Sequence, residues 1–338
     1  MTVVIEHRRW LSAQPPRRVL AMRFQALGDT VITLPYLQSL RRAFPGMRID
    51  FLTRDEVAAI PRELRLFDQV ISFGGARNFW RQLLALLPVL PRLWWRRYDI
   101  VLDLQNSQLS RLASRAAWPR AWSRFERFAP HSAGERTRAT VAAAWNWPVH
   151  LDTGLTLRNS HGSHLLAERG VRPETELVVL NPAGNMSSRS WPIESYVEFA
   201  RLWRQRSPRS RFVLLLLPSM RAKAEQIAAA LGDACIDLTG TADAVQAFGI
   251  VGTSRFMLSE DSALMHMAWV QGIPTLALFS SSRADWARPL GTHTHCLHSA
   301  DLDCGPCGLQ TCRFGDNRCL TRYSARQVFD LASHLASP

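Results

Sequence analysis

The chain has 338 residues, of which 47% are hydrophobic and 20% are charged, so it is long enough for two domains and too apolar for a disordered protein. Its formal net charge is +13, which favours an anionic partner such as a phosphorylated substrate, an anionic membrane or a nucleic acid. No stretch approaches the roughly 18 apolar residues of a membrane span. The polar N-terminus lacks the apolar core of a signal peptide, so we expect a cytoplasmic protein.

Strand-like and helix-like segments alternate from residue 18 onward. The apolar run 18–22 predicts a buried strand, and strands are also predicted at 48–53, 68–73 and 99–105. The helix expected after the first strand has apolar residues at three- and four-residue intervals, namely Val31, Leu34, Leu37, Leu40 and Phe44. This alternation is typical of parallel sheets built from right-handed crossovers.

The segment 78–97 is rich in Leu and Trp and has arginines near both ends. One interpretation is a helix that packs on the sheet and bends at Pro88 and Pro91. The other is a basic amphipathic segment that lies on an anionic membrane surface. The arginine-rich stretch 111–138 either meets an anionic acceptor or is simply solvated.

A second run of alternating segments follows a polar, glycine-containing stretch at about 150–176, which we interpret as a hinge or linker. Strands are predicted at 177–180, 211–217, 235–238, 256–259 and 275–279, and helices at 192–206, 220–231, 242–252 and 262–271. Two such runs predict an α/β protein with two Rossmann-like domains. The chain has neither a G-x-G-x-x-G motif nor a P-loop around its only lysine, Lys223, which argues against NAD dehydrogenases and P-loop ATPases.

The stretch 23–29, Arg-Phe-Gln-Ala-Leu-Gly-Asp, joins the first predicted strand to the first predicted helix. Gly28 suits a tight turn, and Asp29 comes where the helix begins. Ligands of open α/β sheets bind outside the carboxyl ends of the strands, so Asp29 is a candidate for chemistry. Helix capping is the structural alternative.

Two stretches of the second half occupy the same strand-to-helix position. The sequence at 258–266 offers Asp261 and Ser262 as helix N-caps, and the N–H groups of the next turn could hold an anion. The loop 181–192 has Arg189 as its only charged residue, and an arginine there suits a phosphate. Simple capping and a surface arginine are the structural alternatives.

Taken together, these stretches resemble glycosyltransferase family 9, the heptosyltransferases of lipopolysaccharide core assembly. The resemblance covers roughly residues 18–330, with the motifs in the family's order. The corresponding residues are Arg23, Leu27-Gly28-Asp29 and Leu34-Pro35, then Asn181-Pro182 and Arg189-Ser190-Trp191-Pro192, then Asp261 to His266, and finally Gly272-Ile273-Pro274 with the apolar strand 275–279.

The resemblance implies a GT-B fold, with residues 1–160 binding the acceptor and 161–338 binding a nucleotide-sugar donor. It also implies inverting transfer of heptose from ADP-heptose to the lipopolysaccharide inner core, or to a related lipid-linked acidic acceptor, at the inner face of the inner membrane. No cofactor is expected for catalysis, and Asp29 would be the base. The implied donor-binding residues are Asn181, Arg189, Asp261, Ser262, Ala263, Leu264 and His266, and the implied acceptor-binding residues are Arg23, Gly28 and Gln105.

Several positions depart from the family pattern and leave the donor open. Ala263, Ser280 and Asn106 stand where the family commonly has glycine. A transferase for another nucleotide-sugar and a non-catalytic glycan binder are therefore alternatives. A related sugar-nucleotide epimerase is a further alternative, but the loops lack an obvious set of acid/base carboxylates for it. The charge of +13 and twelve tryptophans also allow a binder of anionic surfaces or nucleic acid, but no nucleic-acid module is evident.

Four cysteines form a C-x2-C-x4-C-x6-C cluster at Cys304, Cys307, Cys312 and Cys319. In a cytoplasmic protein such spacing favours a metal site over disulfides, and structural zinc is the first choice. An iron–sulfur cluster and two disulfides remain alternatives.

Overall fold

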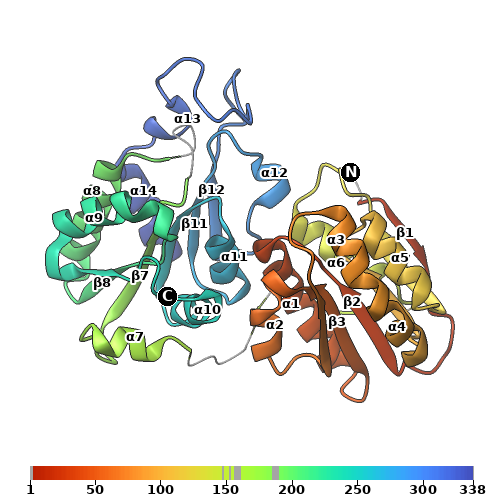
Figure 1. Cartoon of the computed structure of the whole chain (residues 1–338). Helices are drawn as coiled ribbons and strands as arrows, with labels where there is room; N and C mark the ends of the chain where they lie inside the picture. Colours follow the sequence, from red (N-terminus) through yellow and green to blue (C-terminus); the bar gives the residue numbers. More distant parts are fainter. Residues whose placement is uncertain (1–2, 147, 152–153, 156–160, 185–189, 338) are drawn as a thin grey trace. The chain divides into compact units, whose positions relative to one another are not determined.

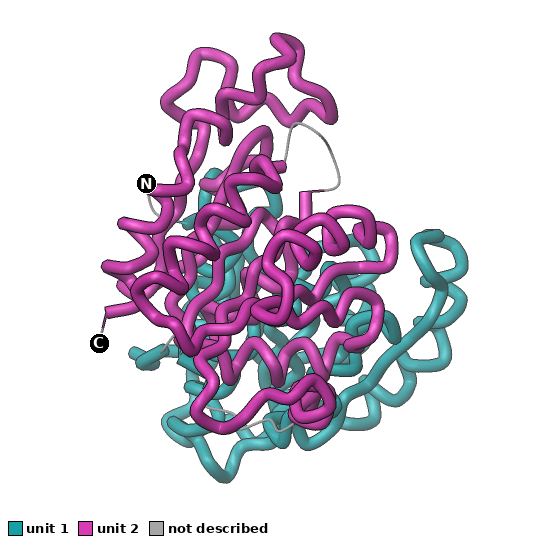
Figure 2. Tube along the Cα trace, turned by 90° about the vertical axis from the view of Figure 1, so that its left-hand side faces the viewer, with its two compact units in different colours: residues 1–155 teal, residues 156–338 magenta. Residues whose placement is uncertain are grey.

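The chain divides into two compact units, unit 1 at residues 1–155 and unit 2 at residues 156–338 (Figures 1 and 2). A computed structural model describes residues 3–146, 148–151, 154–155, 161–184 and 190–337. Each unit contains a six-stranded sheet with helices on both faces. None of the helices within these ranges is long and apolar enough to cross a bilayer.

The sheet of unit 1 has the strand order β1-β6-β5-β2-β3-β4 and is parallel except for β1, which runs antiparallel to β6. Its strands are β1 (Ile5–Arg8), β2 (Arg18–Met22), β3 (Arg48–Arg54), β4 (Gln69–Phe73), β5 (Ile100–Asp103) and β6 (Ala121–Phe125). Helices α1 (Leu27–Ala43) and α6 (Ala133–Ala143) pack together, and α3 (Phe79–Leu86) and α4 (Leu90–Arg96) pack beside α5 (Gln108–Ala116). Short helices are η1 (Asp55–Val57), α2 (Ala59–Glu63) and η2 (Leu87–Val89).

The sheet of unit 2 is parallel throughout and has the order β12-β11-β10-β7-β8-β9. Its strands are β7 (Glu176–Asn181), β8 (Ser210–Leu214), β9 (Cys235–Asp237), β10 (Phe256–Glu260), β11 (Thr275–Leu278) and β12 (Thr294–Leu297). Its helices are α7 (Ser163–Glu168), α8 (Ile193–Arg206), α9 (Arg221–Leu231), α10 (Ala244–Gly252), α11 (Ala263–Val270), α12 (Ala284–Ala287), α13 (Arg318–Thr321) and α14 (Ala325–Leu335), with the 3-10 turns η4 (Pro218–Met220) and η5 (Gly232–Ala234).

Both sheets are buried on both faces, which is why their central strands are continuous apolar runs. In unit 1, Leu20 and Met22 on β2 pack with Leu86 and Leu93 of α3 and α4. In unit 2, the strand side chains pack against α8, α9 and α14, and the rings of Trp203 and Phe256 contact each other in a tilted arrangement with centroids 4.9 Å apart.

The strand order places a topological switch point in each unit. In unit 1, β3 and β4 lie on one side of β2, and β5 and β6 lie on the other. In unit 2, β8 and β9 lie on one side of β7, and β10 to β12 lie on the other. In open α/β sheets the crevice at such a point is the usual ligand site. The stretch 23–29 follows β2, whereas Asn181 ends β7 and Asp261 follows β10.

Some expectations from sequence were wrong. The first strand was predicted only at residue 18, but residues 5–8 form the edge strand β1, whose side chains are mostly exposed and therefore lack an apolar pattern. The expected linker 150–176 contains helix α7, in which Leu165 and Leu166 are buried. Strands β6 and β12 and helix α14 were not predicted.

Candidate active site

An ion pair lies at the switch point of unit 1. Arg23 Nη2 is 2.5 Å from Asp29 Oδ2, and the Arg23 side chain is largely buried. The guanidinium also donates to the carbonyl of Leu104, just after β5. The carboxylate of Asp29 accepts a hydrogen bond from the backbone N–H of Ala26 at 3.2 Å, so it also caps the N-terminal end of α1. Asp29 is therefore oriented by the N–H of Ala26 and by Arg23, which is itself anchored at the end of β5.

Gln105 joins the same arrangement from β5. Its Oε1 accepts the N–H groups of Phe24 and Gln25 at 3.0 and 3.2 Å, and the residue is 5% exposed. Gln105 thus braces the loop that carries the ion pair. Gly28 does not form the expected turn, because it is the second residue of α1 and is buried there.

Arg136 on α6, a member of the arginine-rich stretch 111–138, is a charged neighbour of this ion pair. Burial lowers the pKa of Arg136, the positive charge of Arg23 lowers it further, and the negative charge of Asp29 raises it. Its Nη1 donates to the carbonyl of Arg127 at 2.6 Å. Two arginines around one aspartate leave a net positive charge here, which suits an anionic ligand.

At the switch point of unit 2, a polar network joins β7 to β10. The amide Nδ2 of Asn181 donates to Ser259 Oγ at 2.8 Å and to Ser262 Oγ at 2.6 Å. Asn181 is fully buried, and its Oδ1 has no hydrogen-bond partner among the described residues. Ser262 is the N-cap residue of α11, as predicted by position, but its side chain makes no capping bond. Its hydroxyl oxygen instead accepts the hydrogen bond from Asn181.

The first turns of α11 carry the other predicted donor residues. Asp261, Ala263 and Leu264 are partly exposed, and His266 is buried. The indole Nε1 of Trp269 donates to His266 Nδ1 at 3.0 Å. An indole can only donate, so Nδ1 is the acceptor and a neutral His266 carries its proton on Nε2.

The buried Glu260 and the half-buried Lys223 are two charged residues of this site that were not predicted from the sequence. Glu260 is 1% exposed, and its carboxylate accepts the N–H of Trp191 at 2.7 Å and the N–H of Gly184. Lys223 Nζ donates to the carbonyl of Gly184 and to Ser190 Oγ, both at 2.7 Å. Together they hold the two ends of the segment 184–191. The predicted phosphate ligand, Arg189, belongs to this segment but lies outside the described residues.

Burial raises the pKa of Glu260 from its usual 4.5 to about 7. The N–H groups of Trp191 and Gly184 and the charge of Lys223 oppose this increase without cancelling it. A carboxyl group with such a pKa titrates near neutral pH, next to the predicted donor residues.

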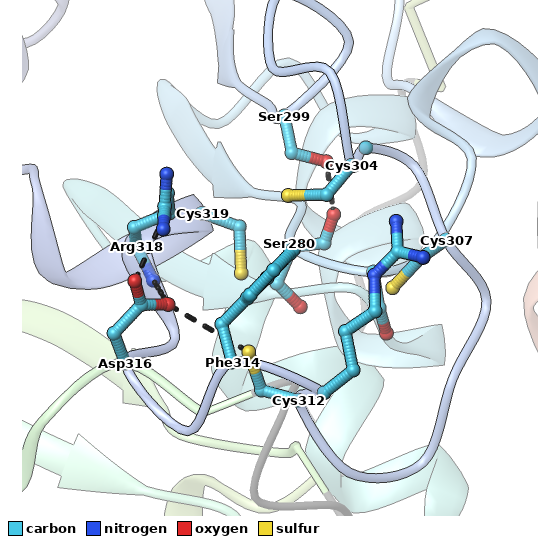
Figure 3. Close-up of a pocket in the computed structure, with 12 residues that line it drawn as sticks. Ser280, Ser299, Cys304, Cys307, Cys312, Phe314, Asp316, Arg318 and Cys319 are labelled. Carbon is cyan, nitrogen blue, oxygen red and sulfur yellow. Dashed lines mark hydrogen bonds and ion pairs between the residues drawn. The ribbon is translucent and has the colours of Figure 1, made fainter.

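The four clustered cysteines line one pocket of unit 2, together with Ser280, Ser299, Asp316 and Arg318 (Figure 3). All four are free thiols. Hydrogen bonds from the backbone of Asn317 and Phe314 lower the pKa of Cys312, whereas burial raises that of Cys319. Within the described parts of the chain, no three or more His, Cys, Asp or Glu side chains are arranged to hold a metal ion. The expectation of structural zinc is therefore not supported, and neither are disulfides.

Two Rossmann-like units in one chain, each with polar side chains at its switch point, are the architecture of the GT-B class, and comparison with known proteins agrees. Residues 90–317 match the model of glycosyltransferase family 9 (heptosyltransferase). Lipopolysaccharide heptosyltransferase 1 of Pseudomonas aeruginosa is 27% identical over 93% of this chain and 91% of its own.

Two solved structures share the fold. A family 9 glycosyl transferase from Veillonella parvula has a TM-score of 0.79 at 17% identity, covering 95% of this chain and 97% of its own. An Escherichia coli heptosyltransferase solved with ADP-2-deoxy-2-fluoro heptose has a TM-score of 0.65 at 20% identity, covering 94% and 99%. This chain belongs to glycosyltransferase family 9, the heptosyltransferase family, and is a glycosyltransferase.

Proposed function

We propose that the protein transfers heptose from ADP-heptose to the lipopolysaccharide inner core or a related lipid-linked, acidic acceptor, with inversion at the anomeric carbon. The observation that carries this proposal is the oriented Asp29 carboxylate at the switch point of unit 1. The relatives support the donor and the acceptor class, since one is a lipopolysaccharide heptosyltransferase and another was solved with a fluorinated ADP-heptose.

In the proposed mechanism, unit 1 holds the acceptor and Asp29 takes the proton from its hydroxyl group. The hydroxyl oxygen then attacks the anomeric carbon from the face opposite the nucleotide, which inverts the configuration. A single positioned base is enough for this step. The net positive charge of Arg23, Arg136 and Asp29 suits the phosphate or carboxylate groups of the acceptor.

Unit 2 would bind the donor at the β7–β10 crevice. The proposed contacts are Asn181, Asp261, Ser262, Ala263, Leu264 and His266, with Arg189 on the adjoining loop. The nucleoside diphosphate is the leaving group. Its departure depends more on neutralisation of its negative charge than on protonation by a general acid. Arg189 and the N-terminus of α11 would supply that neutralisation without a catalytic metal.

A thermal-shift screen of nucleotide-sugars tests the donor assignment. A ligand that binds only the folded protein stabilises it by mass action, by about 2.7 kcal/mol at a hundredfold excess over Kd. We expect ADP-heptose to raise Tm more than UDP- or GDP-sugars do. Replacing Arg189 by Ala should shrink that increase. A larger increase with another nucleotide-sugar would instead support a different donor. That alternative is suggested by Ala263, which stands where the family commonly has glycine.

A further inference from the structure

Helices α3 and α4 and the turn η2 between them form a continuous helical segment with two opposite faces. The inner face packs on the core of unit 1 through Leu86 and Leu93, with Leu83 and Leu90 partly buried beside them. Figure 1 shows α3 and α4 next to α5 on unit 1. The segment therefore has a structural role, as one interpretation of the sequence predicted, but that role uses only its inner face.

The outer face carries large apolar side chains at helical spacing. Trp80 is 69% exposed, Trp94 58% and Trp95 78%, and Leu84 and Leu87 are also exposed. Positions 80, 84, 87 and 94 recur at intervals of four, three and seven, so they form one line along the helix surface. We call the exposed residues Trp80, Leu84, Leu87, Trp94 and Trp95 the α3–α4 ridge. Exposed apolar clusters of this kind usually mark an interaction site.

The charged residues within the segment 79–97 are all arginines. Residues 79–97 contain Arg81, Arg92, Arg96 and Arg97 and no Asp or Glu. Arg96 pairs with Asp50, while Arg81, Arg92 and Arg97 are exposed. Arg81 lies three residues before Leu84, and Arg92 lies three residues before Trp95, so each arginine is next to a ridge residue on the helix surface. Trp and Leu beside arginine is the pattern of helices that lie in the interface of an anionic bilayer.

We propose that the α3–α4 ridge is the surface by which the protein binds an anionic phospholipid bilayer. Tryptophan and leucine side chains would enter the headgroup region, and the arginines would contact lipid phosphates. The apolar ridge favours a bilayer over a nucleic acid, because nucleic-acid surfaces offer stacking and phosphate contacts but no apolar layer for leucine. Bilayer binding by the α3–α4 ridge does not depend on which sugar the protein transfers.

Sedimentation of the full chain with vesicles tests the proposal. We expect binding to vesicles of phosphatidylcholine mixed with phosphatidylglycerol, weaker binding to pure phosphatidylcholine, and a decrease with salt. Replacing Trp94 and Trp95 by Ser should weaken binding by roughly tenfold or more, because apolar area drives insertion. Replacing Arg81 and Arg92 by Gln should weaken binding to the anionic vesicles by roughly tenfold.

A matched control is Phe314→Ser, which removes an exposed aromatic residue that lies between Arg313 and Arg318 in unit 2. This variant should bind the anionic vesicles like the wild type. The four ridge and arginine substitutions alter exposed positions, so Tm should be unchanged, and hydrogen exchange should show protection of 79–97 on vesicles. Wild-type binding by both double variants would overturn the proposal. So would self-association that requires Trp94 and Trp95 without any vesicle binding.

Discussion

Replacing Asp29 by Asn should lower kcat by roughly 10²- to 10⁴-fold, the range that a positioned general base contributes. The substitution keeps the size of the side chain and leaves an oxygen that can accept the N–H of Ala26. It removes the negative charge next to Arg23 and the ability to take up a proton. The affinity for the donor should stay close to that of the wild type, because the proposed donor residues belong to unit 2.

Asp68→Asn is the matched control for this experiment. Asp68 is also an ion-paired aspartate in unit 1, with its Oδ2 2.6 Å from Arg41 Nη1 and a side-chain exposure of 30% against 33% for Asp29. It precedes β4, however, and so lies at the amino edge of the sheet, opposite the switch-point crevice. We expect nearly normal turnover from this variant. Substantial turnover by Asp29→Asn, with the same folded state, would rule out Asp29 as the base.

The second large effect is expected at Glu260, a residue that fixes both ends of the segment 184–191. In Glu260→Gln, an NH₂ group replaces one of the two carboxylate oxygens, so the N–H of Gly184 or Trp191 loses its acceptor. An unsatisfied buried donor costs about 1–3 kcal/mol. We expect a lower free energy of unfolding and a several-fold higher KM for the donor, because Gly184 and Trp191, which flank the stretch containing Arg189, lose part of their anchoring.

The contribution of Glu260 should also depend on pH. Its pKa is raised to about 7 in the folded protein, so between about pH 4.5 and 7 the folded state binds more protons than the unfolded state. Stability from this group is thus fully present below pH 4.5 and is lost as the pH rises through 7. The gap in unfolding free energy between wild type and Glu260→Gln should narrow over this range, by at most about 3 kcal/mol.

Denaturant unfolding at several pH values, together with donor KM, measures both effects. Glu176→Gln provides the control, since Glu176 is a partly buried carboxylate of the same sheet that accepts hydrogen bonds from Ser210 and Trp203. It begins β7, at the edge away from the proposed donor site, so donor KM should not change. A gap that is the same at all pH values, with an unchanged donor KM for Glu260→Gln, would contradict the positioning role.

The fold was largely predictable because the buried parallel strands are apolar runs bounded by turns. The run 18–22 and the strand β2 coincide, as do the predicted helix 220–231 and α9 to within a residue. Segments that bury few side chains were missed, because they lack such apolar runs. The edge strand β1 is mostly exposed, and α7 is only six residues long within a polar stretch.

The site was partly predictable, since switch-point loops can be located from the alternation of strands and helices. Asp29, Asn181 and Ser262 lie where the order of segments placed them. Glu260 was missed, although a charged residue at the end of the apolar strand 256–260 is itself a signal, because buried charges need partners. Those partners, the backbone of Gly184 and Trp191, come from a loop that no local pattern connects to β10.

The proposed heptosyl transfer is tested most directly by the mass of a lipid-linked inner-core acceptor after incubation with ADP-heptose and the purified protein. We expect a product heavier by one heptosyl unit, formed by the wild type and by Asp68→Asn, and formed by Asp29→Asn at a rate lower by roughly 10²- to 10⁴-fold. An acceptor whose mass does not change with ADP-heptose but increases with another nucleotide-sugar would contradict the proposed donor. An equal yield from Asp29→Asn would contradict the proposed mechanism.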